Sequence, residues 1–406
     1  MPFALYLLGL AVFAQGTSEF MLSGLVPDIA ADLSVSIPAA GALTSAFAVG
    51  MVVGAPLAAV VSLRWSRRRA LLGFLVTFLL VHVLGAVTTS FPLLLATRVV
   101  AALANAGFLA VALTTAASLV APNAKGRATA VLLGGTTIAC VAGVPAGALL
   151  GQWWGWRSAF WAVALVSVPA VVAILRSVPA EPPGASDTAG ASDTAGASDT
   201  AGVGARRELA ALRDARLVLT LLLGALVNGA TFGTFTYLAP LATEVTGLAA
   251  DWLPALLALF GLGSFAGVNL GGRLADTRPT RFLVVGGLAL LTGWVVFALT
   301  AGNPVALVVL VFVQGTLSFA VGSTLITRVL YVATGAPRLA GGFATAAMNV
   351  GAALGPWLGG VAISAGLDFR APLWVSALLV AVTLLLMCCP QARQTVHSPS
   401  QPAVRR

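Results

Sequence analysis

The sequence predicts an all-α polytopic membrane protein with twelve transmembrane helices in two pseudo-symmetric six-helix halves. Three observations support this fold class. Of the 406 residues, 59% are hydrophobic and only 9% are charged, whereas an ordinary soluble domain has about 25% charged residues. Apolar runs of about 20 residues, the length that crosses a bilayer, recur along the chain. In addition, several landmark residues recur at one fixed offset in the second half of the chain.

Each predicted span is an apolar run that ends at polar or basic residues. The spans cover residues 3–26, 39–62, 70–88, 91–118, 127–150, 158–176, 216–239, 252–275, 282–300, 303–327, 340–365 and 371–389. The first run lacks the basic segment that begins a signal peptide and leads straight into further spans. We therefore expect it to remain as a membrane helix.

Basic residues gather in the segments that follow the even-numbered spans and in the C-terminal tail. Of the 22 lysines and arginines, all but Arg98, Arg157 and Arg370 lie there. Since basic loops stay on the cytoplasmic side, both termini are predicted to face the cytoplasm, with the protein in the cytoplasmic membrane. This distribution explains the net charge of +9 through topology, so we expect a lipid bilayer around the chain and no nucleic-acid partner.

The composition changes abruptly between the sixth and seventh spans. Residues 185–202 are three consecutive copies of Ala-Ser-Asp-Thr-Ala-Gly. Such a run has no apolar face to bury, so residues 177–212 are expected to form a disordered cytoplasmic linker. The linker separates the N-terminal half, residues 1–176, from the C-terminal half, residues 213–390, and a cytoplasmic tail follows at 391–406.

The two halves share landmarks that indicate a duplicated unit. A proline and two arginines each recur 213 residues later in the chain. The pairs are Pro27 with Pro240, Arg68 with Arg281, and Arg157 with Arg370. Two six-helix halves around an axis along the membrane normal are typical of a rocking transporter with a binding site near mid-membrane.

Glu19 and Arg98 are the only charged residues predicted well inside a span. A charge at the bilayer centre costs about 2.5–3.5 kcal/mol on insertion scales, so such residues usually have a function. Both are predicted at about 10–12 Å from the outer end of their helix, so they share a depth and can face each other. Burial favours a neutral carboxyl and a nearby arginine favours the carboxylate, which suits proton coupling. A purely structural ion pair is the alternative.

The fifth span contains a row of small residues. Gly143, Gly147 and Gly151 lie four residues apart on one helical face and let a neighbouring backbone approach closely. Pro145 lacks a backbone donor and permits a bend. Tight packing without any transport role would also explain this row.

The segments GTSEFMLSGLVPDIAADL and RVVAALANAGFLAVALTTAASLV resemble those of twelve-span drug:proton antiporters of the major facilitator superfamily, in particular bacterial chloramphenicol exporters. The resemblance implies efflux of chloramphenicol, or a related neutral amphipathic drug, by alternating access. Protons would be the coupling ion, and no cofactor or metal is implied. It also implies that Arg98 takes part in proton transfer and that the glycine row with Pro145 is the antiporter motif. The usual Gln-Gly after this arginine is absent, since Ala101 and Ala102 follow.

The same family has a basic loop motif after the second span. In the first half of this chain the motif is degenerate, and its second copy is better preserved. The residues that match it are Arg64, Arg67, Arg68, Gly272, Asp276 and Arg281. A carboxylate at a helix end beside arginines would form a latch between helices that opens when the halves rock. Setting the topology is the alternative role of the arginines.

The central cavity is predicted to be mostly apolar, which suits a neutral drug. Its candidate residues, chosen by helix position, are Phe20, Asn105, Asn228, Phe232, Tyr237 and Asn349. Packing explains each of them almost as well. His82 in the third span is expected to be a packed neutral residue, with a proton relay as the alternative.

Two further functions remain open at this stage. One is export of a sugar, another neutral metabolite or an endogenous antibiotic, and the other is a membrane receptor or scaffold that transports nothing. An enzyme is not expected, because the sequence contains no phosphate-binding loop, nucleophile–base pair or metal-ligand cluster. The chain is expected to work as a monomer.

Overall fold

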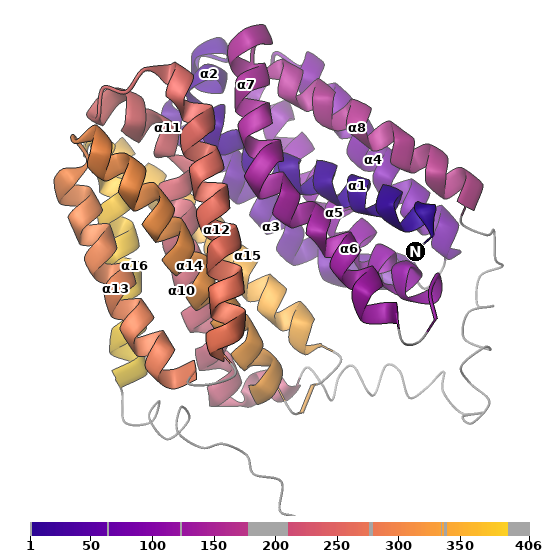
Figure 1. Ribbon diagram of the computed structural model, residues 1–406. Coiled ribbons are helices and arrows are strands. Elements are labelled where there is room, and N and C mark those ends of the chain that lie inside the picture. Colours follow the sequence, from indigo (N-terminus) through magenta and orange to yellow (C-terminus); the bar gives the residue numbers. More distant parts are fainter. Residues whose placement is uncertain are drawn as a thin grey trace, which may run out of the picture.

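The computed structural model describes residues 2–62, 65–121, 124–177, 210–275, 279–333, 335–336 and 339–388. In this part of the chain the secondary structure is helical, with short connections (Figure 1). Eleven helical segments there are long and apolar enough to cross a membrane, and the twelfth predicted span forms a shorter apolar helix. The predicted fold class is therefore confirmed.

The first half consists of six membrane segments and a short helix. Its elements are α1 (Phe3–Phe20), the 3-10 turn η1 (Met21–Gly24), α2 (Val26–Asp32), α3 (Ile37–Ser62), α4 (Arg67–Val87), α5 (Phe91–Ser118), α6 (Lys125–Ile138), the π turn η3 (Ala139–Gly143), α7 (Val144–Trp154) and α8 (Arg157–Ser177). The fifth span is therefore built from α6, η3 and α7 together.

The second half repeats this plan. Its elements are η4 (Ala210–Arg213), α10 (Ala215–Thr236), α11 (Leu238–Pro240), the π turn η5 (Leu241–Val245), η6 (Ala250–Trp252), α12 (Leu253–Ala275), α13 (Pro279–Thr300), α14 (Pro304–Val332), α15 (Ala340–Ser364) and α16 (Ala371–Cys388). The tenth span was predicted to end at residue 327, but α14 continues to Val332. The prediction differs because hydropathy locates only the apolar stretch, and the backbone hydrogen bonds of a helix can extend into the polar residues that follow it.

The two halves lie side by side, and the repeated landmarks occupy corresponding places in them (Figure 1). Pro27 lies in α2 and Pro240 in α11. Arg157 is the first residue of α8, and Arg370 directly precedes α16. Below, the end of the bundle that contains α2 and α11 is called the α2 end.

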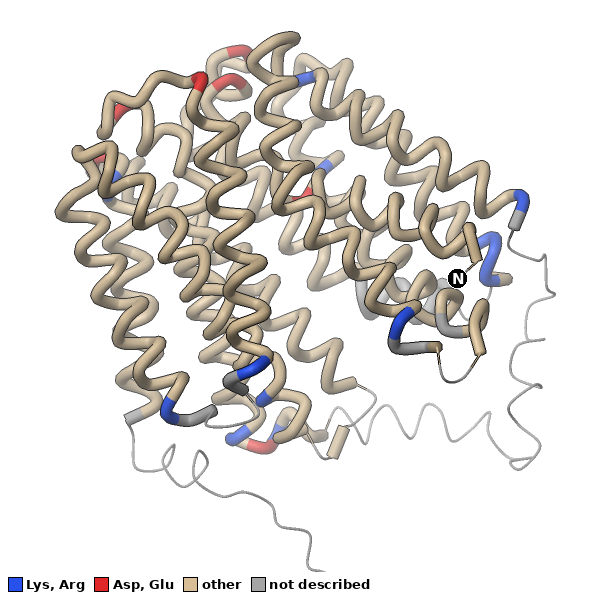
Figure 2. The backbone as a smooth tube through the Cα atoms, viewed as in Figure 1, with Lys and Arg blue, Asp and Glu red and all other residues tan. Residues whose placement is uncertain are grey.

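Charged residues are separated along the bundle. In Figure 2 most of the acidic positions lie at the α2 end, whereas most of the basic positions lie away from it. A separation of this kind is what the positive-inside rule produces when the α2 end faces outward. The orientation of the termini stays a prediction.

The halves meet at the α2 end. The ring of Tyr237 lies between two glycines, since a Cβ atom would lie 2.5 Å from the Tyr237 hydroxyl at Gly41 and 2.6 Å from it at Gly360. Glycine is needed at both places because a side chain would collide with this ring. The Ser45 hydroxyl also donates to the carbonyl oxygen of Ala353 at 2.7 Å. From this contact the halves diverge toward the opposite end (Figure 1).

Candidate functional site

The two intramembrane charges lie in neighbouring helices of the first half. Glu19 is at the end of α1 and is half-buried, whereas Arg98 is in α5 and is only 1% exposed. The two residues lie within range of electrostatic interaction. Among the described residues, however, Glu19 is not part of an ion pair; the ion pairs there join Arg157 to Asp32 and Arg370 to Asp368.

The guanidinium of Arg98 binds Ser18 instead, the residue just before Glu19. Nη1 donates to the Ser18 hydroxyl at 2.8 Å, and Nη2 donates to the Ser18 carbonyl oxygen at 2.7 Å. The carbon Cζ of Arg98 also lies 4.4 Å from the centroid of the Phe47 ring, which is a favourable cation–π distance. Two hydrogen bonds and an aromatic face therefore hold this buried cation.

His82 of α4 completes this buried network. Its Nε2 lies 2.6 Å from the Ser18 hydroxyl, and its Nδ1 lies 2.7 Å from the carbonyl oxygen of Phe78. A carbonyl oxygen only accepts, so the hydrogen is assigned to Nδ1 and Nε2 accepts from Ser18. The Ser18 hydroxyl then accepts from Arg98 and donates to His82. This is the pattern of a neutral histidine packed into the protein.

Gln15 is a polar residue of the same region that sequence analysis missed. It lies about one helical turn before Ser18 and Glu19, so the three share one face of α1. Its side chain is 1% exposed, and in the described part of the chain neither amide atom has a hydrogen-bond partner. An unpaired buried polar group costs about 1–3 kcal/mol. The sequence signal was its position four residues before Glu19 in an apolar span.

The glycine row of the fifth span packs against α1 and η1. A Cβ atom on any of the three glycines would meet a side chain of the first span. The facing pairs are Gly143 with Thr17, Gly147 with Met21, and Gly151 with Leu25. The close approach expected of small residues thus joins the fifth span to the helix that contains Glu19.

Pro145 follows a change of helix type in the fifth span. Ala139–Gly143 form the π turn η3, and the N–H of Val144 donates to the carbonyl oxygen of Ala139, five residues earlier. Proline cannot donate to the carbonyl four residues before it, and a π turn is one way in which a helix accommodates such a defect. The sequence suggested only a bend at Pro145, whereas the structure has a widened π turn directly before it.

The second half packs directly on this π turn. A Cβ atom at Gly261 of α12 would lie 2.8 Å from the carbonyl carbon of Cys140 and 2.9 Å from the Cα atom of Val141. Further along the fifth span, Nε2 of Gln152 in α7 donates to the Ala250 carbonyl oxygen at 2.6 Å. Gly261 is not conspicuous in the sequence, because a lone glycine in an apolar helix gives no information about its partner.

Three of the predicted cavity residues lie where the halves meet. Phe20 of the first half stacks on Phe232 of the second, with ring centroids 5.6 Å apart and an angle of 23° between the rings. Phe20 directly follows Glu19 and is half-buried. Tyr237 donates through its hydroxyl to the carbonyl oxygen of Pro356 at 2.9 Å and fills the contact at the α2 end.

The three predicted asparagines are not gathered at one place. Each side-chain amide nitrogen has a partner within its own half: Asn105 with Met51 Sδ at 3.5 Å, Asn228 with the Met348 carbonyl at 2.7 Å, and Asn349 with the Thr345 carbonyl at 3.0 Å. Asn228 and Asn349 belong to the packed pair α10 and α15. Asn105 lies in α5 of the other half.

The predicted latch is only partly described. Arg68 donates through Nη2 to the carbonyl oxygen of Leu175 at 2.7 Å, which joins α4 to α8 within the first half. Arg67 is half-buried at the start of α4, and Gly272 and Arg281 lie near the facing ends of α12 and α13. Two residues lie outside the described residues: Arg64 and Asp276.

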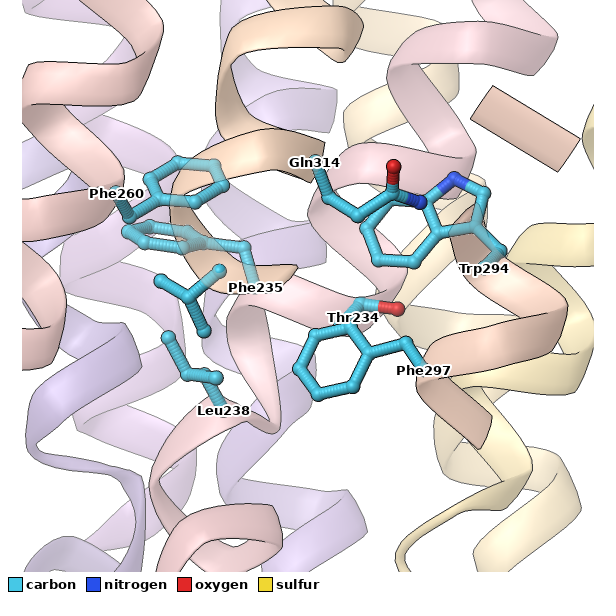
Figure 3. Close-up of a pocket in the computed structure, with 8 residues that line it drawn as sticks. Thr234, Phe235, Leu238, Phe260, Trp294, Phe297 and Gln314 are labelled. Carbon is cyan, nitrogen blue, oxygen red and sulfur yellow. The ribbon is translucent and has the colours of Figure 1, made fainter. Parts of the chain in front are cut away.

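The second half also contains a small cavity, which sequence analysis did not predict (Figure 3). Its volume is about 10 Å³, and it is lined by Thr234, Phe235, Leu238, Phe260, Trp294, Phe297, Val311 and Gln314. Phe235 and Phe260 stack with their centroids 4.3 Å apart. The lining residues come from α10, α11, α12, α13 and α14, so the cavity lies within one half.

Comparison with known proteins gives a consistent result. The sequence profile of the Major Facilitator Superfamily matches residues 8–341. The chain is 58% identical over 386 residues to a "Chloramphenicol resistance protein" of Streptomyces lividans, covering 95% of each chain. It is 34% identical over 392 residues to the "Inner membrane transport protein YdhP" of Escherichia coli K12, covering 97% of each.

Solved structures of low sequence identity share the fold. A bacterial homolog to the human lysosomal transporter Spinster, in an inward-facing and unoccupied conformation, matches with a TM-score of 0.76 at 17% identity, covering 97% of this chain and 96% of that chain. The nucleoside transporter NupG matches with a TM-score of 0.73 at 13% identity, covering 95% of this chain and 100% of that one.

Proposed function

This chain belongs to the major facilitator superfamily, and we propose that it exports chloramphenicol or a related neutral amphipathic drug in exchange for protons. The substrate class is supported by the 58% identity to a chloramphenicol resistance protein across 95% of both chains. Efflux of this kind lowers the drug concentration in the cell and confers resistance. The family makes the chain a transporter rather than an enzyme.

Alternating access is supported by the contact between the halves. Two contacts close the α2 end: the Tyr237 ring packs between two glycines, and the Ser45 hydroxyl donates to the Ala353 carbonyl oxygen. The halves diverge toward the other end (Figure 1). A rocking motion that breaks these contacts would expose the centre to the opposite side. In this proposal the cytoplasm lies at the diverging end, together with both termini and the linker.

Glu19 is the proposed site of the coupling proton, and Arg98 is its positioning residue. Because Arg98 is bound to Ser18, Glu19 can gain or lose a proton without the separation of an ion pair. The guanidinium still acts on Glu19 electrostatically. When the halves rock, the hydration of the half-buried carboxyl changes, and with it the relative stability of its two protonation states.

The neutral substrate is proposed to bind beside the stacked pair Phe20 and Phe232. These rings come from different halves, and Phe20 directly follows Glu19 in the sequence. An apolar aromatic surface with a few polar groups is typical of small-molecule sites, and separation of the two rings would couple drug binding to rocking. Asn228 and Asn349, on the packed pair α10 and α15, are proposed to line the second-half wall of the central cavity, and Asn105 of α5 is proposed to line its first-half wall.

The remaining assignments rest on the family and the packing. The glycine row with Pro145 is proposed to maintain the contact of the fifth span with α1 during the cycle. Arg68 with Leu175 in the first half, and Gly272 with Arg281 in the second, are proposed to belong to the latch at the diverging end. The chain is proposed to act as a monomer with protons as its only coupling ion.

The test is accumulation of labelled chloramphenicol in cells with and without the protein. We expect lower accumulation and higher resistance when the protein is present, and loss of both effects when the proton gradient is collapsed. Sugars and other neutral antibiotics in the same assay distinguish the alternative substrates. Unchanged chloramphenicol accumulation, in cells whose membranes demonstrably contain the protein, would refute the proposal.

A further inference from the structure

Two asparagines of the second half are anchored by one end of the side-chain amide. Nδ2 of Asn228 in α10 donates to the carbonyl oxygen of Met348 at 2.7 Å, and Nδ2 of Asn349 in α15 donates to that of Thr345 at 3.0 Å. A backbone carbonyl only accepts, so in both amides the end that faces it is the nitrogen. The orientation of the two amides is thus determined, and Oδ1 is the end that remains.

Neither Oδ1 atom has a hydrogen-bond partner among the described residues. The side-chain atoms that are both buried and unpaired in this part of the chain do not include them. Each oxygen therefore reaches the surface of the protein, although Asn228 is half-buried and Asn349 is only 8% exposed. Since an amide oxygen can accept two hydrogen bonds, each is an unused acceptor that a small molecule can reach.

Asn228 lies on the side of α10 that faces the first half. It precedes Phe232 by one helical turn, so the two residues share a face of the helix, and Phe232 stacks on Phe20 of the first half. Because α10 runs toward the α2 end, Asn228 lies about 6 Å further along the axis toward the diverging end (Figure 1). It therefore borders the aromatic pair on the side where the halves separate.

Asn349 borders the same opening from α15. It lies one turn before Ala353, on the same face, and the Ala353 carbonyl oxygen accepts from the Ser45 hydroxyl of α3. The chain of α3 runs in the opposite direction, so the corresponding residue there is Val49, one turn after Ser45. Val49 is 49% exposed, so α3 and α15 no longer cover each other at the level of Asn349.

The two oxygens have the same chemistry. Both can only accept, so a substrate group that pairs with them must be a donor, which means a hydroxyl or an N–H group. Asn105 in the first half has a similar arrangement, since its Nδ2 donates to Sδ of Met51 at 3.5 Å and its oxygen is also unpaired without being sealed in the described part of the chain. The polar groups of the three asparagines that remain available are thus acceptors.

We propose that Oδ1 of Asn228 and Oδ1 of Asn349 determine substrate specificity by accepting hydrogen bonds from hydroxyl or N–H groups of the drug. This role rests on the proposed function, because it concerns the same central site. A site that binds a hydroxyl rejects an analogue without it, since the acceptor is then left unpaired. Chloramphenicol has the required chemistry, because it is neutral and carries hydroxyl groups and an amide N–H.

The first test measures binding to the purified full-length protein by isothermal titration calorimetry. Chloramphenicol is compared with two analogues, each with fluorine in place of one hydroxyl group, because fluorine is similar in size and cannot donate. We expect at least one analogue to bind about tenfold more weakly, the effect of one lost hydrogen bond. Equal binding of all three compounds would overturn this inference and leave the proposed export intact, whereas absence of chloramphenicol binding would refute the proposed substrate itself.

The second test assigns the effect to the asparagines. In Asn228→Leu or in Asn349→Leu the weaker analogue should bind nearly as well as chloramphenicol, because the acceptor is gone. The ratio of the two affinities is compared, so a general loss of affinity does not affect the result. Asn303→Ser is the control and should keep the parental ratio, since Oδ1 of Asn303 already accepts from the N–H groups of Val305 and Ala306 and serine also caps a helix. An unchanged ratio in both leucine variants would overturn the proposal.

Discussion

Arg98 donates two hydrogen bonds to Ser18, one to the hydroxyl at 2.8 Å and one to the carbonyl oxygen at 2.7 Å. Both Nη atoms of the buried cation are therefore hydrogen-bonded one residue away from Glu19, and the Ser18 hydroxyl in turn donates to Nε2 of His82. Glu19 therefore lies in the positive electrostatic potential of Arg98, but no hydrogen bond from the guanidinium holds its carboxyl in place. That arrangement suits a group that must exchange protons repeatedly.

Replacement of Ser18 by alanine should destabilise the protein and impair transport. The variant leaves Nη1 of Arg98 and Nε2 of His82 without their partner, and each unpaired buried group costs about 1–3 kcal/mol. Thermal unfolding in detergent measures the loss. The matched control is Ser23→Ala, since the Ser23 hydroxyl is also buried but bonds only to the carbonyl of Phe20 in its own segment. Equal midpoints for the two variants would show that the network contributes nothing.

Glu19→Gln should abolish uphill efflux and keep downhill drug exchange. The amide resembles the protonated carboxyl in size and charge, so the helix still inserts and a neutral drug still binds. Rocking continues without net proton movement. The measurement is drug uptake into inverted vesicles with an acidic interior. Glu244→Gln, at an exposed position near the α2 end, is the control. Normal uptake by Glu19→Gln would exclude Glu19 as the coupling site.

The contact between Asp32 and Arg157 should make stability depend on pH in the acidic range. Nη1 of Arg157 donates to Oδ2 of Asp32 at 2.5 Å, and this hydrogen bond holds the pKa of Asp32 below its ordinary value of 3.8. A lowered carboxyl pKa adds stability above the unfolded value, and the contribution disappears as the pH falls through the folded value.

Asp32→Asn should therefore melt slightly below the parent at neutral pH, and the difference should close as the pH falls below 3.8. The side chains are 30% and 43% exposed, so solvent screening limits the effect to about 0.2–1 kcal/mol. Melting curves from neutral pH to about pH 3 give the comparison, with Asp251→Asn on the exposed turn η6 as the control. A gap that stays constant with pH would contradict the assignment.

Gly261→Ala should slow transport strongly. The added methyl group would collide with the carbonyl of Cys140 in the π turn, so α12 must move away from the fifth span and weaken the closed α2 end. Gly322→Ala is the matched control, because a Cβ atom there has no neighbour within 4 Å. Initial rates of drug uptake into vesicles with equal protein content test this. A parental rate for Gly261→Ala would mean that the contact has no role in the cycle.

Some features were predictable because the bilayer acts on each residue locally. Every span must be apolar, so the runs of hydrophobic residues gave the helices and their order, and the recurring prolines and arginines gave the duplication. For the same reason Glu19 and Arg98 were conspicuous, since an intramembrane charge is costly wherever the helix faces. The glycine row was recognisable because small residues four apart define a helical face without knowledge of the partner.

The sequence by itself thus determined the membrane spans, the two halves and the two intramembrane charges of this protein. Only the tertiary structure decided that Arg98 binds Ser18 and not the neighbouring carboxylate, that Gln15 is buried on the same face, and that Gly261 meets the π turn. The same holds for the cavity beside Trp294 and Gln314. The physical reason is that hydropathy fixes which segments enter the membrane. The rotation of each helix, and the atoms it meets, follow from the packing of helices that are distant in the chain.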